Sequence, residues 1–372
     1  MEISRNIMKY DYVIVGSGFF GSICARELTD IGKKCLVIDK RDHVAGNCYT
    51  KEMEGVNVHM YGSHIFHTNN KEIWEYVNRF ASFNNFVNRV KANCDGDVYS
   101  LPINLQTLQS LWGVSTPEEA KKKLEEVCER IENPKNAEEW LYANVGKEIT
   151  NMFYRGYTEK HWMKPLKDLP ISIYKRLPIR TNFDDNYYNH QYQGVPVGGY
   201  TKLFESLLKD IEVVLNVDFF DKKEYYESLA HKIIYTGPID EFFEYKHGEL
   251  EYKTVKIDFK TYDIDDYQGC AVFSHPQHNV EYTKSVEHKH FEANKLKNKT
   301  IVSYEYPIEW SKDKTPYYPL NDKENNKKYN KYKEDALRLD KYVFGGRLAE
   351  YKYYDMHQVV GSALSCVKGQ SK

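Results

Sequence analysis

Three glycines near the start of the chain have the spacing of a turn that binds the pyrophosphate of a dinucleotide. The segment Gly16–Gly21 reads G-x-G-x-x-G, follows the apolar run Tyr12–Val15 and precedes a stretch with one apolar helical face. In such a turn the first glycine permits the bend, the second admits the pyrophosphate and the third lets helix and strand pack closely. The free N–H groups of the helix N-terminus attract the phosphate charge. We therefore predict cofactor contacts at Gly16, Ser17, Gly18, Phe20 and Gly21.

A carboxylate lies where the ribose of that cofactor is expected. A second apolar run, Cys35–Ile38, ends at Asp39, about 20 residues after the glycines, as in dinucleotide-binding units. Strand, helix and acid together disfavour the alternative of a glycine turn that binds nothing. Because a carboxylate accepts ribose hydroxyls, it favours FAD or NAD over NADP. The basic turn that follows adds Lys40, Gly46 and Asn47 to the predicted cofactor site.

Two histidines, His64 and His67, lie three residues apart between small and aromatic residues. Imidazoles are good metal ligands, but the neighbouring sequence holds no third ligand at a suitable spacing. The sequence also shows no convincing catalytic triad, carboxylate pair or cysteine cluster. We therefore predict no metal site, and two buried core histidines are the plain alternative for this pair.

A proline-containing basic segment in the middle of the chain suits a nucleotide diphosphate. Lys164–Asp185 carries Arg176 and Arg180, and aromatic residues flank it at Trp162 and Tyr187. Aromatic rings stack on a base, while guanidinium groups form bidentate contacts with phosphates. A merely solvated loop is the alternative, but loops of this length are commonly functional or disordered. We predict a mobile binding loop near residues 164–180.

The remaining patterns predict an α/β protein with several subdomains. A chain of 372 residues is long for one compact core. Helical spacing runs from Asn104 to about Gly156, a hairpin is expected to turn at Asp95-Gly96, and alternation over Leu250–Tyr306 predicts an antiparallel sheet. A late strand ending in Gly345-Gly346-Arg347, followed by a terminal helix, indicates that the C-terminus completes the nucleotide-binding unit. Asn321–Asp335 is predicted as a solvated loop and helix start.

Composition excludes several classes of protein. The chain has 52 Lys and Arg against 54 Asp and Glu, a formal net charge of −2, which disfavours nucleic-acid and polybasic membrane binding. Its seven cysteines are scattered without a C-x-x-C pair, which suits a reducing cytoplasm. No apolar run approaches the roughly 18 residues of a membrane span. The 32 tyrosines are consistent with composition bias, with a cleft lined by rings, or with both.

Two features distinguish FAD from NAD. The turn Lys40–Asn47 and the late Gly-Gly-Arg strand resemble FAD proteins of the glutathione-reductase and amine-oxidase type. Six longer stretches resemble the bacterial UDP-galactopyranose mutase family in order, from Met8 almost to the C-terminus. These stretches are residues 10–21, 61–68, 156–162, 192–203, 234–240 and 344–358.

The resemblance implies an isomerase that interconverts UDP-galactopyranose and UDP-galactofuranose for cell-surface polysaccharide synthesis. In that family FAD must be reduced, and its N5 attacks the anomeric carbon of the sugar and displaces UDP. The resemblance also implies a cytoplasmic homodimer without nucleic-acid or membrane partners. A mutase for UDP-N-acetylgalactopyranose, an amine-oxidase-type FAD oxidoreductase and a binding module without chemistry remain alternatives.

Site residues follow from the resemblance, position by position. Arg176 corresponds to the loop arginine over the diphosphate, His67 to a histidine that influences the flavin, and Lys284 to a second diphosphate clamp, which is usually arginine. Lysine keeps the charge but loses the planar bidentate fork. Further implied cofactor residues are His64, Thr236, Arg347, Asp355 and Met356. Implied substrate residues are Asn88, Phe153, Tyr157, Thr158, Trp162, Arg176, Tyr187, Lys284, Tyr318 and Tyr353.

We predict three parts of the chain. Residues 8–85, 197–242 and 319–372 form a discontinuous FAD-binding Rossmann-like domain. Residues 104–163 form a helical insertion. Residues 86–103, 164–196 and 243–318 form an antiparallel sheet domain for the substrate.

Overall fold

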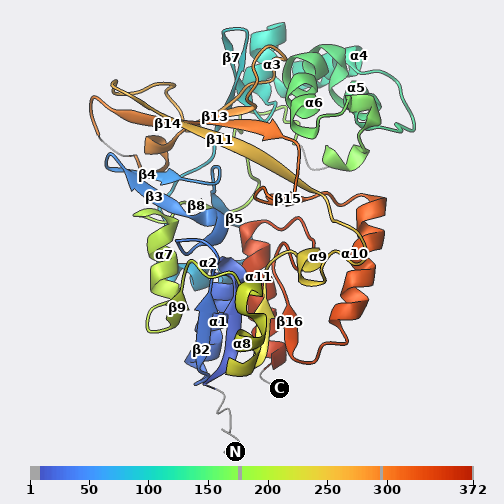
Figure 1. Cartoon of the computed structure of the whole chain (residues 1–372). Coiled ribbons are helices and arrows are strands. Elements are labelled where there is room, and N and C mark those ends of the chain that lie inside the picture. The colour runs from blue at the N-terminus through green and yellow to red at the C-terminus, as the bar shows by residue number, and fades with distance from the viewer. Residues whose placement is uncertain (1–8, 175–177, 294–295, 371–372) are drawn as a thin grey trace, which may run out of the picture.

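The computed structural model describes residues 9–174, 178–293 and 296–370. Within these residues, one five-stranded parallel sheet forms the lower part of the molecule in Figure 1, and a seven-stranded sheet crosses above it. Two short ribbons lie between them, β3–β4 and β5–β8. The predicted α/β class is confirmed.

The parallel sheet joins the start, middle and end of the chain. Its strand order is β16-β10-β1-β2-β9. The central strand β1 pairs with β2 on one side and with β10 on the other, both in parallel. Because both faces of these strands are covered, β1 and β2 are almost wholly apolar. Their bounds are β1 Tyr10–Val15, β2 Cys35–Ile38, β9 Glu212–Val214, β10 Ala230–Tyr235 and β16 Tyr342–Phe344. The predicted late strand is thus confirmed.

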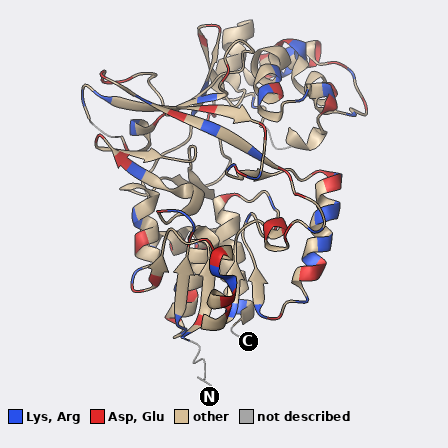
Figure 2. Ribbon diagram, in the orientation of Figure 1, with Lys and Arg blue, Asp and Glu red and all other residues tan. Residues whose placement is uncertain are grey.

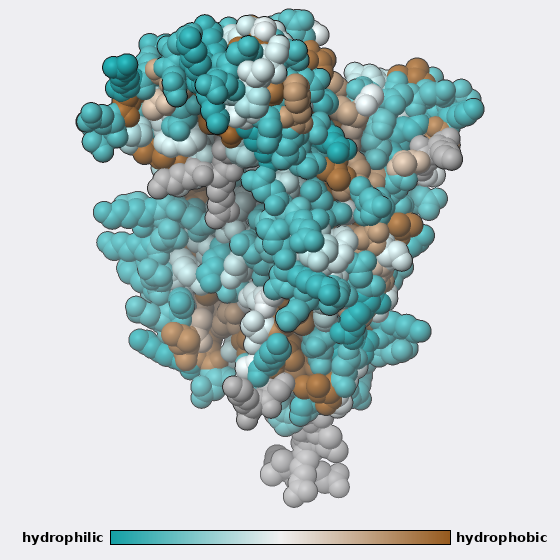
Figure 3. All heavy atoms as spheres, turned by 180° about the vertical axis from the view of Figure 1, so that it is seen from behind, coloured by the Kyte–Doolittle hydropathy of each residue, from teal (hydrophilic) through white to brown (hydrophobic). Residues whose placement is uncertain are grey.

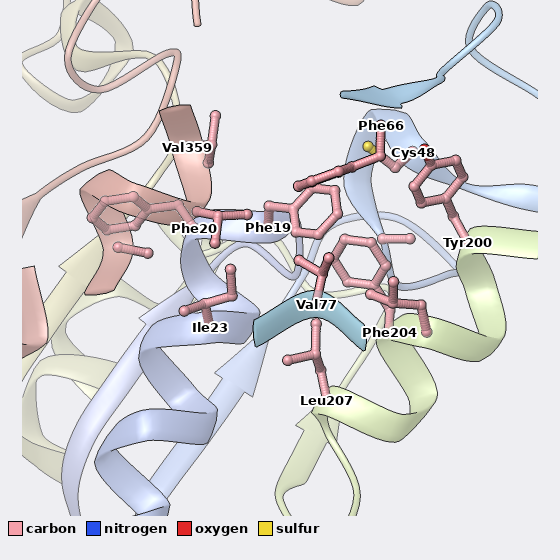
Figure 4. Close-up of a cluster of buried hydrophobic side chains, with 14 of the residues drawn as sticks. Phe19, Phe20, Ile23, Cys48, Phe66, Val77, Tyr200, Phe204, Leu207 and Val359 are labelled. Carbon is pink, nitrogen blue, oxygen red and sulfur yellow. The ribbon is translucent and has the colours of Figure 1, made fainter. Parts of the chain in front are cut away.

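Three helices cover one side of this sheet and enclose the main hydrophobic core. They are α1 Phe19–Asp30, α7 Gly199–Leu207 and α11 Met356–Gln370, with α2 Lys71–Asn78 beside them. Figure 4 shows Phe19 and Phe204 facing one another from α1 and α7, and their ring centroids lie 4.7 Å apart. Val359 of α11 packs against Phe20 from the other side. Burying each such ring contributes about 1.5–3 kcal/mol, so this core fixes the start of α1.

The second sheet is mixed rather than purely antiparallel. Its order is β15-β11-β14-β13-β12-β6-β7, in which β12 and β6 pair in parallel. The predicted hairpin is confirmed, because Asp95 and Gly96 both have positive φ, as a two-residue turn between β6 and β7 requires. The bounds are β6 Val90–Cys94, β7 Asp97–Leu101, β11 Tyr252–Tyr262, β12 Val272–Ser274, β13 Lys284–Glu287, β14 Thr300–Ile308 and β15 Tyr318–Pro319.

Helices cluster beyond the edge strand β7, at the upper right of Figure 1. They are α3 Leu105–Trp112, α4 Pro117–Val127, α5 Ala137–Ile149, a π-helical turn Thr150–Arg155 and α6 Gly156–Trp162. A capping box starts α4: the side chain of Thr116 accepts from the backbone N–H of Glu119, whose carboxylate accepts from the backbone N–H of Thr116 in return. These helices share a separate core that includes Leu108 and Leu141.

The prediction for Asn321–Asp335 was wrong in part, because a full helix, α10 Lys323–Ala336, occupies this segment. The carboxylate of Asp322 caps it by accepting from the backbone N–H of Asn325. Figure 2 shows charges of both signs around α10, which is why the segment looked solvated. One buried ring, Tyr332, anchors the helix by donating a hydrogen bond to the carbonyl of Gly248.

The remaining elements are short. They are β3 Thr50–Met53, β4 Val56–His59, β5 Phe66–Thr68, β8 Tyr192–Gly194, α8 Lys223–Leu229 and α9 Ile239–Phe242. On the face in Figure 3, hydrophobic residues form small separate patches within a hydrophilic surface. Among the described residues, no helix has the length and apolar character to cross a membrane. The three-part division of the chain stays a prediction.

Candidate functional site

The Gly16–Gly21 turn is built so closely that side chains would not fit. Gly16 has φ +107°, and a Cβ there would lie 2.0 Å from the hydroxyl of Thr236. A Cβ on Gly21 would lie 1.9 Å from the carbonyl oxygen of Gly16. Gly18 is the N-cap of α1 and offers no side-chain cap to the first N–H groups of the helix. The turn therefore presents backbone donors to an anion, as the sequence predicted.

A cavity opens over this turn at the carboxyl ends of β1, β2 and β10. Twelve of the predicted cofactor residues line it: Gly16, Gly18, Phe20, Gly21, Asp39, Lys40, Gly46, Asn47, His64, Thr236, Arg347 and Met356. Ser17 and Asp355 are predicted cofactor residues outside this lining. Sequence reasoning missed Phe219, Tyr245 and Trp310, which also line the cavity and come from segments without a recognisable motif.

Asp39 is held by the turn itself. Its Oδ2 accepts hydrogen bonds from the backbone N–H and the hydroxyl of Ser17, at 2.7 and 2.6 Å, and its Oδ1 accepts from the backbone N–H of Arg41 at 3.0 Å. A carboxylate has about four acceptor sites, so one remains for a ligand. Asp39 can therefore accept one ribose hydroxyl, rather than two, without losing these contacts.

A second group of polar residues gathers around Lys284 on β13. Its ammonium lies 3.4 Å from the Oε2 of Glu305, a carboxylate that is only 6% exposed. Glu305 and then Tyr157 raise the pKa of Lys284 well above its ordinary value, so the lysine is charged. Tyr318 and Tyr187 also raise the pKa of Lys284. The structure therefore brings together four predicted substrate residues from distant parts of the chain.

Arg347 connects this Lys284 cluster to the cavity. The arginine lines the cavity, and its guanidinium carbon lies 5.5 Å from the ring centroid of Tyr318. The ring of Tyr318 stacks on that of Tyr353 at 5.0 Å. Arg347 is held in place by donating to the backbone carbonyls of Tyr317 and Tyr354. The cavity and the cluster are thus adjacent, with Arg347 between them.

The predicted substrate residues differ in what their side chains touch. Phe153 is a core residue whose ring packs edge-on against Tyr99 at 5.2 Å. Thr158 forms a hydrogen bond with the hydroxyl of Tyr174. The ammonium of Lys253 donates to the carbonyl of Trp162 and lies over its ring.

Two further predictions have different outcomes. Asn88 is buried, and its Oδ1 has no hydrogen-bond partner among the described residues, as expected of a polar group that contacts a ligand. Arg176 lies outside the described residues. That Arg176 binds the diphosphate of the substrate stays a prediction.

The two predicted histidines lie in different surroundings. His64 lines the cavity, and burial lowers its pKa to about 4. His67 is outside the cavity lining; its Nδ1 lies 2.6 Å from the Nδ1 of His190, and its ring stacks on Tyr188 at 3.7 Å. His357 joins this group with its ring 5.6 Å from that of His67. The sequence did not reveal a third histidine because His190 and His357 lie far from His67 in the sequence.

Lys160 is a further residue that the sequence did not single out. Its ammonium donates to the backbone carbonyls of His275, Gln277, Val280 and Tyr282, at 2.8, 2.7, 2.7 and 3.1 Å. It therefore ties α6 to the loop that leads into β13. Nothing in the sequence around Lys160 marks it as important. For Glu305 a signal existed, because it is a charged residue at a buried position of a predicted strand.

Comparisons with known proteins identify the family of the chain. A family model described as UDP-galactopyranose mutase matches residues 152–353, and one described as NAD(P)-binding Rossmann-like domain matches residues 14–80. The chain is 39% identical over 367 residues to the probable UDP-galactopyranose mutase of Klebsiella pneumoniae, covering 97% of this chain and 93% of that protein. It is 37% identical over 365 residues to the dTDP-fucopyranose mutase of Escherichia coli, covering 96% and 97%.

A solved structure shares the fold. The crystal structure of a reduced UDP-galactopyranose mutase matches with a TM-score of 0.74 and 13% identity, covering 98% of this chain and 94% of that one. On the family model and the whole-length relatives together, the chain belongs to the UDP-galactopyranose mutase family.

Proposed function

We propose that this chain is a flavin-dependent isomerase that interconverts UDP-galactopyranose and UDP-galactofuranose for cell-surface polysaccharide synthesis. The observation that carries the proposal is that a dinucleotide cavity lies beside the cationic, tyrosine-rich cluster around Lys284, with Arg347 lining the cavity and lying against Tyr318 of the cluster. Such a cluster suits the diphosphate and sugar of a nucleotide sugar. Membership of the UDP-galactopyranose mutase family supports a UDP sugar as the class of substrate.

FAD fits the residues of the cavity. The glycine turn would hold its pyrophosphate, Asp39 a ribose hydroxyl, and His64, Arg347 and Met356 the flavin end. Bound there in its reduced form, FAD would supply a nucleophilic N5 that displaces UDP from the anomeric carbon of the sugar.

The protein's own groups would bind and orient the substrate. Lys284 would hold the diphosphate of the leaving UDP, together with Arg176, by charge-assisted hydrogen bonds worth about 1.5–3 kcal/mol each. Since Glu305 keeps Lys284 charged, this grip persists throughout the physiological pH range. The stacked rings of Tyr318 and Tyr353 would form a wall of the sugar pocket. The influence of His67 on the flavin stays a prediction.

The direct test is conversion of UDP-galactofuranose with and without dithionite, followed by chromatography. We expect conversion only with the reduced protein. Conversion that is indifferent to flavin reduction, or none in either state, would refute the proposal. Light scattering of the same sample tests the expected homodimer, and fractionation of cells tests the expected cytoplasmic location.

A second candidate is a mutase for a deoxythymidine nucleotide sugar. It is favoured by one observation, the 37% identity over nearly the whole chain to a dTDP-fucopyranose mutase. Parallel assays with UDP-galactopyranose, dTDP-fucopyranose and UDP-N-acetylgalactosamine under reducing conditions separate these substrates. We expect the highest kcat/KM with UDP-galactopyranose.

Asp39→Ala is expected to lower the FAD content of the purified protein. The substitution removes the acceptor for two hydrogen bonds from Ser17 in the glycine turn and one from Arg41, and the acceptor site left for the ribose. Charged hydrogen bonds of this kind contribute about 1.5–3 kcal/mol each, so FAD affinity should fall at least tenfold. The flavin-to-protein absorbance ratio measures this, with Asp42→Ala, at an exposed neighbour, as the control. Unchanged FAD content would remove Asp39 from the cofactor site.

Lys284→Arg is expected to bind UDP as tightly as the wild type or up to about tenfold more tightly. Tenfold in affinity corresponds to one additional charge-assisted hydrogen bond. Arginine restores the planar fork that grips a phosphate with two parallel donors. Isothermal titration with UDP measures the affinity, and Lys256→Arg on the exposed face of β11 is a matched control. Weaker binding by Lys284→Arg would show that Glu305 and its neighbours have shaped the pocket around lysine.

A further inference from the structure

We propose that His67, His190 and His357 form a binding site for a divalent transition-metal ion that prefers imidazole ligands, such as Zn²⁺ or Co²⁺. One ring nitrogen from each histidine lies within 4.8 Å of the others. The ring centroids form a near-regular triangle with sides of 4.8, 5.6 and 5.2 Å. This proposal does not depend on the proposed isomerase activity.

Three separate segments hold the histidines in place. His67 lies on β5, which pairs with β8, and His190 lies just before β8. His357 is in the first turn of α11, which packs on β5 near the centre of the molecule (Figure 1). Tyr188 stacks on the ring of His67 and fixes its plane. Because each ligand comes from a different element, the site is formed only in the folded protein.

The geometry leaves ring nitrogens available to a metal. Burial disfavours the charged imidazolium of His67 and of His357, which lowers the pKa of both. The Nδ1 of His357 is buried and has no hydrogen-bond partner among the described residues. The Nδ1 atoms of His67 and His190 lie 2.6 Å apart, within hydrogen-bond distance. A metal ion would displace this hydrogen bond, and the ring that carries its proton on Nδ1 would carry it on Nε2 instead, so that both Nδ1 lone pairs face the ion.

The ligand chemistry selects the class of ion. In tetrahedral zinc sites, metal–nitrogen distances of about 2.0–2.1 Å place the ligand nitrogens about 3.3 Å apart. His67 and His190 would therefore separate by about 0.7 Å, and His357 would approach, with a water as fourth ligand. Mg²⁺ and Ca²⁺ prefer oxygen ligands and should not bind. The N-terminus of α11 carries a partial positive charge, which disfavours a cation. The negative charge of Asp355, which acts on His357, offsets this effect.

Metal binding would act on the cofactor cavity through α11. Met356, which precedes His357, lines that cavity. A bound ion would link α11 rigidly to β5 and to the segment before β8.

The test uses the full-length FAD-loaded protein without a histidine tag. Equilibrium dialysis against Co²⁺, Zn²⁺ or Mg²⁺ measures metal per chain, and Co²⁺ absorption at wavelengths beyond the flavin bands reports the geometry. The variants are His190→Ala and His357→Ala, and the control is His231→Ala at an exposed position. Thermal melting without metal checks that each variant folds, and His190→Gln replaces any that does not.

We expect one Co²⁺ or Zn²⁺ per chain in the wild type and in His231→Ala, with affinity at least tenfold weaker in the His190 and His357 variants. Intense Co²⁺ bands would indicate tetrahedral geometry. Equal binding by all variants, no saturable binding by the wild type, or equally tight Mg²⁺ binding would each overturn the proposal.

Discussion

Gly21→Ala should leave the protein without FAD. The added Cβ would lie 1.9 Å from the carbonyl oxygen of Gly16 and 3.1 Å from the side chain of Ile14, so α1 must move away from β1. Overpacking at a tight backbone contact costs about 3 kcal/mol. The movement also shifts the N–H groups at the start of α1 from the pyrophosphate. Flavin absorbance after gel filtration and the midpoint of denaturant unfolding measure the two effects.

The control for this experiment lies on another helix of the same core. Gly369, near the end of α11, has open space where its Cβ would lie. Gly369→Ala should therefore keep its FAD and unfold at an equal or slightly higher midpoint, since alanine is the better helix former. Retention of FAD by Gly21→Ala at the level of Gly369→Ala would contradict the close packing of α1 on the turn.

Lys160→Met should weaken substrate binding strongly while FAD stays bound. The substitution leaves four backbone carbonyls without their shared donor and frees the loop between β12 and β13. That loop leads into Lys284, and α6 carries Tyr157, so their relative positions would loosen. Each lost charge-assisted hydrogen bond is worth about 1.5–3 kcal/mol. We expect KM for the UDP sugar to rise at least tenfold, measured in steady-state assays with reduced protein.

The pH dependence of KM tests the same contact. Burial lowers the pKa of Lys160 to about 8, so its positive charge and its third N–H donor are lost as the pH rises through that value. KM of the wild type should rise above pH 8, whereas KM of Lys160→Met should be high and flat. Lys160→Arg, which keeps a charge at every pH, should recover part of the binding. A wild-type KM that is flat from pH 7 to 9 would refute the role of the ammonium.

Local patterns predicted the strands and the helix around the glycine turn well. The turn from Gly16 to Gly21, the acid at Asp39 and their flanking strands are close in sequence, and each has a steric or electrostatic role that one residue type fills. The structure confirms the strands and the helix and places the glycines and Asp39 on the cavity. The number of acceptor sites that Asp39 has left for a ribose could not be read from the sequence, because Ser17 and Arg41 occupy three of them.

Contacts between residues far apart in the sequence could not be predicted from the sequence alone. Lys284 was predicted as a clamp, but its partner Glu305 belongs to another strand. His67 was considered only with its neighbour His64, while His190 and His357 approach it through the β5–β8 ribbon and α11. The error at α10 had a different cause: its charged surface hid the buried ring of Tyr332. Such partners depend on the packing of elements, which residue spacing along one segment does not specify.

The order of strands in the parallel sheet also governs how this protein is made. Since β16 is formed by Tyr342–Phe344, its neighbour β10 stays an unpaired edge until the ribosome has made these residues. At about 5–20 residues per second, translation takes roughly 20–70 s to reach that strand. Arg347, which follows it, completes the cofactor cavity. The cavity would therefore be complete only after residue 347 has been made, and until β16 pairs with it β10 would be an open sheet edge.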